Sequence, residues 1–424
     1  YIENLRFEKE QLDYLRSTKD FDEDFLAYLE NFRFSGDIYA LEEGTVVFPG
    51  EPLMIVKAPI IEAQLMESAL LNIVNFQTLI ATKASRVAYV AQPGQVSEFG
   101  LRRAQAPDAA VYGARAALIG GCSSTSNVLA AQMCDTFATG THAHSWIMAF
   151  DSELEAFRAY AEIYPDSCLL LVDTYDTLRG VKNAITVFKE MREKGLKPKG
   201  IRLDSGDLAY LSKKAREMLD EAGFEDAMIF ASGDLDEYTI QSLKLQGARI
   251  DCYGVGTKLI TSHSNPSLGG VYKICEVEEN GVMTPKMKIS DNPAKVTNPG
   301  EKRIFRLVSK NNNKAIADVI CLADEKIDES KPYTLIHPEY RWKTKEVRNF
   351  RAKELYRQIY KDGKLVYDLP DLKTIQRRKR ESFDEFWDEY KRLEKPHIYK
   401  VDLSEKLYNL KQKLIDELVG KKGK

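Results

Sequence analysis

The amino-acid sequence predicts an α/β protein built around a parallel sheet, and we favour a β/α barrel over an open doubly wound sheet. Short apolar runs alternate with helical stretches through the middle of the 424-residue chain. Their spacing of roughly 25–30 residues suits one strand–helix repeat. Because the runs are apolar throughout, they indicate strands covered on both faces. Each run ends in Asp, Ser or Gly, where barrels and open α/β sheets carry their chemistry.

The region before these repeats predicts a short helix, a pair of strands and a long buried helix. Residues 20–33 are amphipathic, and residues 44–59 read as strands. Residues 61–90 carry apolar side chains on most sides of a helical wheel, which is typical of a core helix. A further helix is expected to begin at Pro107 or Asp108.

Four strand–helix repeats follow in the middle of the chain. Each apolar run is short enough for a buried strand, and helical sequence comes after it. The four runs are CLLLVDTYD (168–176), GIRLDSGD (200–207), AMIFASGDLD (227–236) and RIDCYGVGTKL (249–259).

The repeating pattern stops after Ser262. Residues 273–290 predict a hairpin that turns at Asn280-Gly281, and residues 311–324 suggest another strand. The last eighty residues, 345–424, look helical and charged.

These boundaries predict two regions of the chain. A barrel region covers residues 101–269, because the strand–helix pattern is confined there. A flanking layer combines residues 1–100 with residues 270–424.

The composition excludes several classes of protein. A net charge of −3 with 44% hydrophobic and 29% charged residues is ordinary for a globular protein, and it attracts neither nucleic acid nor an anionic membrane. The basic run Arg377–Arg380 precedes acidic residues, so we read it as a solvated helix face. None of the six cysteines forms a C-x-x-C pair, which argues against a thiolate zinc site and favours the reducing cytoplasm. No run reaches the roughly 18 apolar residues of a membrane span.

The segment FATGTHAHSWIMAF holds His142 and His144, two of the five histidines in the chain. In a strand, positions i and i+2 share one face, so the pair can chelate a metal as in barrel hydrolases. The later strand ends offer no histidine, and two imidazoles hold zinc poorly without a third ligand. Two alternatives stay open: both rings pack in a loop, or one catalytic imidazole lies beside a non-catalytic one, which we favour.

Acidic residues at the strand ends are expected to meet at the barrel mouth. Asp173 and Asp204 come directly after strands, whereas Asp207 and Asp234 suit the N-caps of the following helices equally well. The loop YGVGTKL (253–259) can cradle a phosphate with backbone N–H groups or be a plain turn. Together with three nearby arginines, these residues indicate a phosphorylated, metal-bound anionic substrate. The arginines are Arg102, Arg103 and Arg202.

Eight segments, taken in order, resemble the nicotinate phosphoribosyltransferase family. They are LLNIVNFQTLIATKASRV, EFGLRRA, SSTSNVLAA, GTHAHSW, LLLVDTYDTLRGV, IRLDSGDLAYL, GVGTKL and IHPEYRWKTKEV. The resemblance implies an irregular α/β barrel of the type II phosphoribosyltransferase kind beside an α/β sandwich, with a helical C-terminal segment. It also implies that nicotinate and phosphoribosyl pyrophosphate give nicotinate mononucleotide and pyrophosphate, aided by ATP hydrolysis and Mg²⁺. This would be a ligase-type first step of NAD salvage in a cytoplasmic homodimer with a shared active site.

The resemblance assigns a role to one of the two histidines. His144 matches the histidine that ATP phosphorylates, and Asp173 matches the acid that hydrogen-bonds this imidazole. A phosphohistidine adds negative charge and can reorganise basic loops. His142 matches no required position, so we treat it as packing.

The resemblance also places the substrates. Asp204, with Arg202, is expected at the ribose and the base. The 5′-phosphate is expected on backbone N–H groups of Gly233, Asp234, Gly254, Gly256 and Thr257. Phe99 and Arg102, with Arg103 beside them, match residues that face the pyridine ring and the substrate anions.

Ser126 is expected to select the base. The nicotinamide-using relative carries Asp here, which would repel the carboxylate of nicotinate. Two like charges about 4 Å apart cost about 4 kcal/mol at an effective dielectric constant of about 20. A hydroxyl at a helix start favours an anion instead, although Ser126 also suits a plain N-cap. The alternatives within the same class are nicotinamide and quinolinate.

One departure from the family lies at the front of the chain. Family members open with a D-x-Y-x-x-T-M-like segment whose aromatic residue stacks on the base, and this sequence starts late by comparison, at Tyr1. Either the sequence is a fragment or the segment is absent, in which case the ring has only Phe99 to stack on. Two rival classes are a metal-dependent barrel hydrolase using His142 and His144 and a non-catalytic binding protein.

Overall fold

The computed structural model describes residues 1–290 and 296–420, and the chain forms two compact units. We call residues 73–269 with 371–376 the barrel unit, and residues 1–72, 270–370 and 377–424 the sandwich unit. Residues 73–100, which the sequence analysis assigns to the flanking layer, belong to the barrel unit. They include β3, a strand of the barrel sheet.

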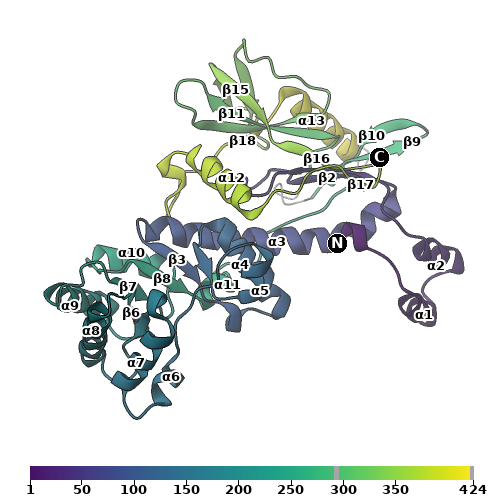
Figure 1. Cartoon of the computed structure of the whole chain (residues 1–424). Helices are drawn as coiled ribbons and strands as arrows, with labels where there is room; N and C mark the ends of the chain where they lie inside the picture. The colour runs from purple at the N-terminus through teal and green to yellow at the C-terminus, as the bar shows by residue number, and fades with distance from the viewer. Residues whose placement is uncertain (291–295, 421–424) are drawn as a thin grey trace. The chain divides into compact units, whose positions relative to one another are not determined.

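Six parallel strands form the sheet of the barrel unit, in the order β4-β3-β8-β7-β6-β5 (Figure 1). The strands are β3 (Gln95–Glu98), β4 (Ser124–Thr125), β5 (Leu169–Leu171), β6 (Gly200–Leu203), β7 (Met228–Ala231) and β8 (Cys252–Val255). The four apolar runs are confirmed as β5 to β8, and β3 and β4 are strands that the sequence does not predict. The predicted α/β class, with a parallel sheet and a separate sheet-bearing unit, is confirmed.

Helices alternate with these strands and cover the outer face of the sheet. The long buried helix is confirmed as α3 (Ile60–Ala91), whose residues from 73 onward belong to this unit. The other helices are α4 (Pro107–Gly120), α5 (Val128–Met133), α6 (His144–Met148), α7 (Glu153–Ile163), α8 (Thr177–Glu193), α9 (Leu208–Glu221), α10 (Glu237–Leu245) and α11 (Thr257–Ile260), with 3-10 turns η2 (Leu101–Arg103) and η3 (Pro165–Ser167).

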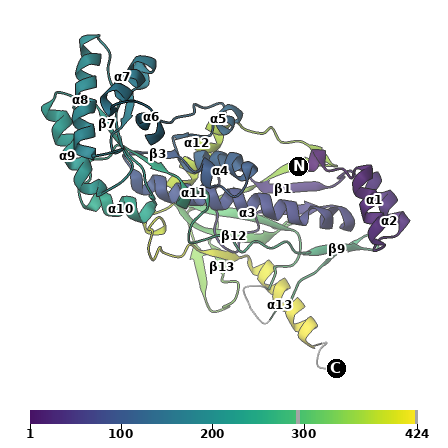
Figure 2. The same cartoon turned by 90° about the horizontal axis from the view of Figure 1, so that it is seen from below.

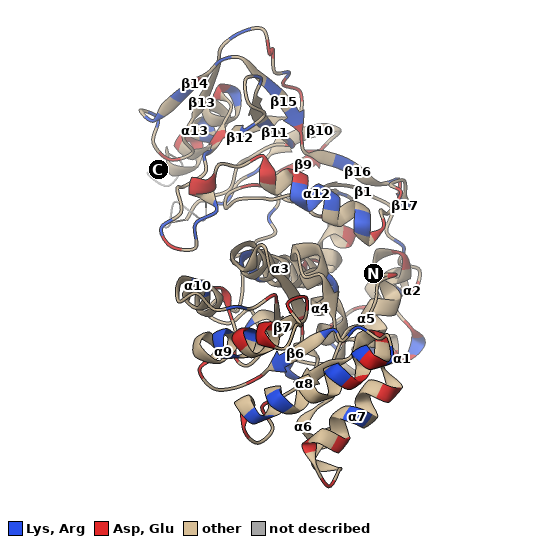
Figure 3. Cartoon of the chain, turned by 60° about the vertical axis from the view of Figure 1, so that its left-hand side comes forward, with Lys and Arg blue, Asp and Glu red and all other residues tan. Residues whose placement is uncertain are grey.

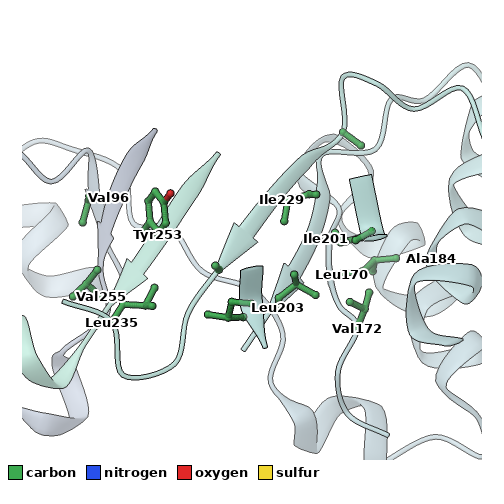
Figure 4. Close-up of a cluster of buried hydrophobic side chains, with 14 of the residues drawn as sticks. Val96, Leu170, Val172, Ala184, Ile201, Leu203, Ile229, Leu235, Tyr253 and Val255 are labelled. Atoms are coloured by element: carbon green, nitrogen blue, oxygen red, sulfur yellow. The ribbon is translucent and has the colours of Figure 1, made fainter. Parts of the chain in front are cut away.

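Alternating strand side chains hold the sheet against its helices. Ile201 and Leu203 of β6 and Ile229 of β7 are fully buried in one hydrophobic cluster with helical side chains such as Ala184 of α8 (Figure 4). Full burial of such an aliphatic side chain contributes about 1.5–3 kcal/mol relative to exposure. The core thereby fixes the carboxyl ends of the strands, from which the candidate site residues project.

Aspartates cap the helices that follow β5, β6 and β7. The side chains of Asp176, Asp207 and Asp236 accept hydrogen bonds from backbone N–H groups in the first turns of α8, α9 and α10. Asp207 is therefore a cap. Asp234 does not cap a helix, although its position made capping an alternative, because Asp236 caps α10 instead.

The segment between α5 and α6 lies along the gap between the edge strands β4 and β5. Ala138 forms an isolated parallel bridge with Thr125 of β4, and the Thr139 N–H donates to the Thr125 carbonyl at 2.9 Å. On the other side of the gap, the Leu171 N–H of β5 donates to Nε2 of His142 at 3.1 Å. In the described residues β4 and β5 do not pair with each other. The barrel is therefore irregular, with a loop in place of strand pairing at its seam.

The sandwich unit contains three sheets, with strand orders β17-β16-β1-β2, β14-β13-β18-β12-β11-β15 and β10-β9. The strands are β1 (Asp37–Leu41), β2 (Met54–Lys57), β9 (Glu276–Glu279), β10 (Val282–Pro285), β11 (Lys302–Ser309), β12 (Ala315–Leu322), β13 (Tyr333–Ile336), β14 (Thr344–Val347), β15 (Phe350–Glu354), β16 (Tyr356–Lys361), β17 (Lys364–Leu365) and β18 (Val401–Leu403). The predicted hairpin is confirmed as β9–β10, with positive φ at Asn280 and Gly281. The strand expected within 311–324 is confirmed as β12.

Helices complete the sandwich unit. They are α1 (Lys9–Thr18), α2 (Glu23–Glu30), α12 (Leu372–Asp384) and α13 (Glu405–Gly420), with 3-10 turns η1 (Ile2–Asn4) and η5 (Asp388–Tyr390). The part of α3 before residue 73 also belongs to this unit, and α12 belongs to it from residue 377 onward. The helices α1 and α2 lie side by side, and α13 packs on β12 and β13 through Leu407 and Tyr408 (Figure 2).

Two expectations for this unit are wrong in part. The last eighty residues are not all helical, because β14 to β18 lie wholly or largely within them. Their strands carry many charged residues on exposed positions, as in β14, where only Val347 is buried. Of the strands expected over 44–59, only β2 is present.

Charged side chains are mixed in sign over both units (Figure 3). Arg378 of the basic run pairs with Glu42 at 2.9 Å, and Arg377 lies 3.9 Å from Glu381 on the same helix. Arg377 is exposed, as expected of a solvated helix face, whereas Arg378 is largely buried and ion-paired. Within the described ranges, no helix has both the length and the apolar character needed to cross a membrane.

Candidate active site

The carboxyl ends of the parallel strands gather most of the candidate residues in the barrel unit. Asp173 follows β5, Asp204 follows β6, and Ser232 follows β7. Phe99 and Ser126 follow β3 and β4 on the other side of the sheet. Because these strands are parallel and hydrogen-bonded in one sheet, their ends lie at the same edge.

His144 faces this edge from the first turn of α6. Its Nδ1 lies 3.1 Å from Oγ1 of Thr174, and its Nε2 lies 3.8 Å from Oδ2 of Asp204. The side chain is 42% exposed, so the imidazole is open to a substrate. Sequence reasoning missed Thr174, because a threonine after a strand-end aspartate has no distinctive signal.

His142 is buried and structural. Its ring packs edge-on against Tyr160 at 4.6 Å, and burial lowers its pKa to about 4. The neutral Nε2 accepts the Leu171 N–H, so its lone pair is not available to a metal. Among the described residues, no group of three His, Cys, Asp or Glu side chains is placed to hold a metal.

Asp204 is held ionised at the mouth. Burial alone raises its pKa, but hydrogen bonds from the Ser232 hydroxyl and the Arg202 guanidinium outweigh burial, and the net pKa lies below its ordinary value. The Arg202–Asp204 contact is 2.7 Å. A carboxylate fixed in this way presents its other oxygen toward His144.

Asp173 does not form the hydrogen bond to His144 that the family resemblance implies. Its Oδ2 accepts the Asp204 N–H at 3.0 Å and the Ser205 hydroxyl at 2.6 Å. Its Oδ1 is buried without a hydrogen-bond partner among the described residues. Asp173 therefore ties the end of β5 to the end of β6, and Thr174 takes the position beside the imidazole.

Arg202 joins the two halves of the site. Its guanidinium donates to Ser232 Oγ and to Thr141 Oγ1, both at 2.8 Å, and lies 5.5 Å from the centroid of the Phe99 ring. Phe99 stacks on Phe230 with centroids 5.5 Å apart. The sequence does not predict the roles of Thr141 and Ser232, since both contacts join distant segments.

The predicted phosphate glycines divide into two kinds. Gly233 has φ +102°, and a Cβ there would lie 2.2 Å from the Asp204 carbonyl oxygen, so this turn requires glycine. Asp234 also has positive φ, and Gly256 precedes α11, which starts at Thr257. Gly254 lies inside β8, where a Cβ would come within 2.9 Å of Phe99, so packing already accounts for this glycine.

Ser126 is not a helix cap. The Asn127 side chain caps α5 by accepting the Ala130 N–H at 3.1 Å, and the hydroxyl of Ser126 has no hydrogen bond in the described part of the chain. Arg102 and Arg103 are exposed in the 3-10 turn η2, which follows β3. The site therefore combines fixed carboxylates, an open imidazole, and cationic and hydroxyl groups that suit an anionic sugar phosphate.

Comparison with known proteins decides the family. The sequence model of the nicotinate phosphoribosyltransferase (NAPRTase) family matches residues 94–330, and models of its N-terminal and C-terminal domains match residues 1–75 and 301–411. The nicotinate phosphoribosyltransferase of Bacillus subtilis (strain 168) is 51% identical over 419 residues, which cover 99% of this chain and 85% of that protein. The chain belongs to the nicotinate phosphoribosyltransferase family.

Further relatives and solved structures are similar to this chain in sequence and fold. The Caenorhabditis elegans protein is 34% identical over 470 residues, with 96% of this chain and 83% of that protein covered. The crystal structure of human nicotinic acid phosphoribosyltransferase superposes with a TM-score of 0.85 at 29% identity, covering 96% of this chain and 89% of that one. Nicotinate-nucleotide pyrophosphorylase from Pyrococcus furiosus gives a TM-score of 0.67 at 26% identity, covering 86% and 84%.

Proposed function

We propose that this chain transfers the phosphoribosyl group of phosphoribosyl pyrophosphate to nicotinate, giving nicotinate mononucleotide and pyrophosphate. Family membership supports this reaction, and one observation in the site carries it: Asp204 is kept ionised by Arg202 and Ser232 at the strand ends. In the transfer, the bond from ribose C1 to pyrophosphate breaks and its electron pair leaves with pyrophosphate. The pyridine nitrogen then forms the new bond to C1.

The chemistry needs electrostatic stabilisation rather than a base. The attacking nitrogen carries no proton, so no group has to remove one. The ribose passes through an oxocarbenium-like state, whose positive charge the carboxylates of Asp204 and Asp173 stabilise. Arg202 and the exposed Arg102 and Arg103 neutralise substrate anions, and the 5′-phosphate is held by residues after β7 and β8. Gly233 and Asp234 follow β7, and Gly256 and Thr257 follow β8, with Gly254 inside β8 as the fifth residue.

The residues present fit a magnesium ion that is shared with the substrate. Asp173 offers a carboxylate oxygen, Oδ1, that is buried without a hydrogen-bond partner, and Asp204 lies beside it. Mg²⁺ is commonly held by one or two carboxylates together with substrate phosphates. When bound, it would neutralise charge on the departing pyrophosphate.

ATP hydrolysis is coupled to this transfer through His144. In this step the γ-phosphoryl group moves from ATP to an imidazole nitrogen, ADP leaves, and water later cleaves the phosphoramidate bond. Two observations support His144 as the acceptor: its side chain is 42% exposed, and its ring is fixed between Thr174 and Asp204. Nicotinate mononucleotide made in this way is the first product of NAD salvage from nicotinate.

Ser126 selects nicotinate over nicotinamide, and a free hydroxyl beside the start of α5 supports this role.

The active form is a homodimer, supported by exposed apolar side chains near the mouth at Val128, Leu129, Met133, Phe137 and Met148. The location is the cytoplasm, because none of the six cysteines forms a disulfide in the described structure.

A product assay tests the function directly. The purified chain is incubated with phosphoribosyl pyrophosphate, Mg²⁺ and ATP, and with nicotinate, nicotinamide or quinolinate in separate reactions. Chromatography should detect nicotinate mononucleotide and an equal amount of pyrophosphate. No product, or a preference for nicotinamide or quinolinate, would contradict the proposal.

A further inference from the structure

Glu98 is a buried carboxylate at the active-site edge with no role in the chemistry above. It ends β3 and is 1% exposed. In the parallel pairing of β3 with β4 it lies opposite Thr125, which is fully buried. A carboxylate removed from water in this way is retained at a cost unless hydrogen bonds satisfy it.

Both carboxylate oxygens of Glu98 accept hydrogen bonds. The Thr125 hydroxyl donates to Oε2 at 2.6 Å, and the Gly100 N–H donates to Oε1. The Thr125 oxygen in turn accepts the Asn127 N–H at 3.0 Å, and the Glu98 carbonyl accepts the Ser126 N–H at 3.0 Å. One connected network therefore spans the ends of β3 and β4.

This network brackets both residues expected to contact the base. Phe99 lies between Glu98 and Gly100, and the Glu98 carboxylate accepts the Gly100 N–H. Ser126 lies between Thr125 and Asn127, and the Thr125 hydroxyl accepts the Asn127 N–H. Strand side chains alternate, so Phe99 and Ser126 share the face opposite to Glu98 and Thr125.

Contacts on that opposite face support this placement. Ser97 and Ser124, two residues before Phe99 and Ser126, face each other with hydroxyls 2.8 Å apart. The Phe99 ring stacks on Phe230 of β7.

Gly100 is part of the same device. A Cβ at this position would lie 2.4 Å from Cβ of Ile260 and 2.7 Å from Oε1 of Glu98. Only glycine at this position leaves room for the Glu98 carboxylate to fold back onto the Gly100 N–H. The glycine of the sequence EFG is thus required by two contacts, the closer one with Ile260 and the other with the Glu98 carboxylate.

We infer that Glu98 is a positioning residue that sets Phe99 and Ser126 relative to each other and thereby governs recognition of the pyridine carboxylate; this inference rests on the proposed function. A carboxylate suits the position because both of its neighbours are donors. An amide would lose the charge and turn its NH₂ group toward the Thr125 hydroxyl, which would then have to accept where it now donates.

Three variants of the full chain test the inference. Glu98→Gln keeps the side-chain shape but removes the charge and reverses one hydrogen bond of the network. Thr125→Val keeps the shape but removes the hydroxyl, whereas Thr125→Ser keeps the hydroxyl. Glu153→Gln is the matched control, because Glu153 is another buried carboxylate of the barrel unit, bonded to Asn183 on α8. The readouts are KM for nicotinate, KM for phosphoribosyl pyrophosphate, kcat, the nicotinate-to-nicotinamide preference and the melting temperature.

We expect Glu98→Gln and Thr125→Val each to raise KM for nicotinate about tenfold, as for a lost hydrogen bond to a charged group, and to weaken the preference over nicotinamide. KM for phosphoribosyl pyrophosphate should stay near the wild-type value. Thr125→Ser should keep KM for nicotinate near the wild-type value. The double variant Glu98→Gln with Thr125→Val should be no worse than either single variant, because both substitutions act on one network.

Several outcomes would overturn the inference. Equal increases in KM for both substrates would reduce Glu98 to a general structural role, as would a Thr125→Ser variant as impaired as Thr125→Val. Variants that behave like Glu153→Gln while the wild type turns over would refute the inference alone. A wild-type chain that forms no nicotinate mononucleotide would refute the proposed function, and the inference with it.

Discussion

At the scale of single residues, the proposed choice between two bases of almost equal shape rests on one serine hydroxyl. Ser126 is not used as a helix cap, since Asn127 caps α5. Its hydroxyl is therefore free to hydrogen-bond a substrate carboxylate, whereas a carboxylate at this position would repel the same group.

Ser126→Asp should reverse the preference of the enzyme. We expect kcat/KM for nicotinate to fall by about two to three orders of magnitude, because two like charges about 4 Å apart repel by about 4 kcal/mol at an effective dielectric constant of about 20. Activity with nicotinamide should appear or rise. Steady-state kinetics with both bases measure the change, and Ser126→Ala is the control that removes the hydroxyl without adding charge. A Ser126→Asp variant that still prefers nicotinate would remove Ser126 from the account of specificity.

Single residues also show where sequence reasoning reaches its limit. Asp173 and Asp204 are predictable because each ends an apolar strand run, and Asp207 because it precedes a helical stretch. Thr174, Thr141 and Ser232 are not predictable, because their partners are 28–61 residues away along the chain. Such contacts exist only once the strands are side by side.

At the scale of elements, the turn after β7 depends on one glycine. Gly233 adopts φ +102°, and a side chain there would collide with the backbone carbonyl of Asp204. Asp204 also carries the central carboxylate of the site. The turn and the position of Asp204 are therefore coupled.

Gly233→Ala should destabilise the barrel unit and displace Asp204. We expect the free energy of unfolding to fall by about 2 kcal/mol or more, from the left-handed backbone and the clash together. Denaturant unfolding measures the loss, and Gly269→Ala is the control, because a Cβ at Gly269 meets nothing within 4 Å. Equal stability of the two variants would show that the turn does not need glycine.

The elements of the sandwich unit meet at a buried ionic cluster. Arg306 of β11 is paired with Asp318 of β12 at 2.8 Å, and the Tyr399 hydroxyl also donates to Asp318. Glu51 is buried nearby, and neither of its carboxylate oxygens has a hydrogen-bond partner in the described structure. Burial, and then the charge of Asp318, raise the pKa of Glu51 well above its ordinary value, although Arg306 opposes this.

Glu51 should make the stability of the chain fall with rising pH. A carboxyl whose folded pKa is raised keeps its proton while the unfolded chain loses one, so stability decreases from the ordinary pKa of Glu upward. Glu51→Gln removes this titration, and we expect it to be more stable than the wild type at pH 8 and closer to it at pH 5. Unfolding curves at the two pH values test this. An unchanged pH dependence in Glu51→Gln would show that Glu51 is ionised in the folded chain.

Prediction of elements succeeded where apolar periodicity is strong and failed where charge hides it. The buried strands β5 to β8 and the helix α3 follow from their apolar sequences. The strands β14 to β17 carry many lysines, arginines and glutamates on exposed positions, so their alternation is weak and they resemble charged helix. The seam between β4 and β5 was also not predictable, because a loop replaces a strand there.

At the scale of the whole molecule, several of the exposed apolar side chains lie on α5, on α6 and in the segment between them, beside the candidate site. Phe137 is 87% exposed and Val128 is 71% exposed, and both belong to the segments that flank the site. Surfaces of this kind are typical of subunit contacts.

We expect the chain to sediment as a dimer. Leu129→Lys, on the same exposed surface, should shift it toward the monomer, because a charge would have to be buried in the contact. Sedimentation velocity measures both forms, and Leu245→Lys is the control, since Leu245 at the end of α10 is also an exposed leucine. A monomeric wild type would contradict the proposed shared site.

The central claim is that His144, held between Thr174 and Asp204, couples ATP to phosphoribosyl transfer. The most direct measurement is the initial rate of nicotinate mononucleotide formation with and without ATP, for the wild type, His144→Ala and the remote control His397→Ala. We predict that ATP accelerates the wild type and His397→Ala, while His144→Ala keeps a basal rate that ATP does not change. Full stimulation by ATP in His144→Ala would contradict the account.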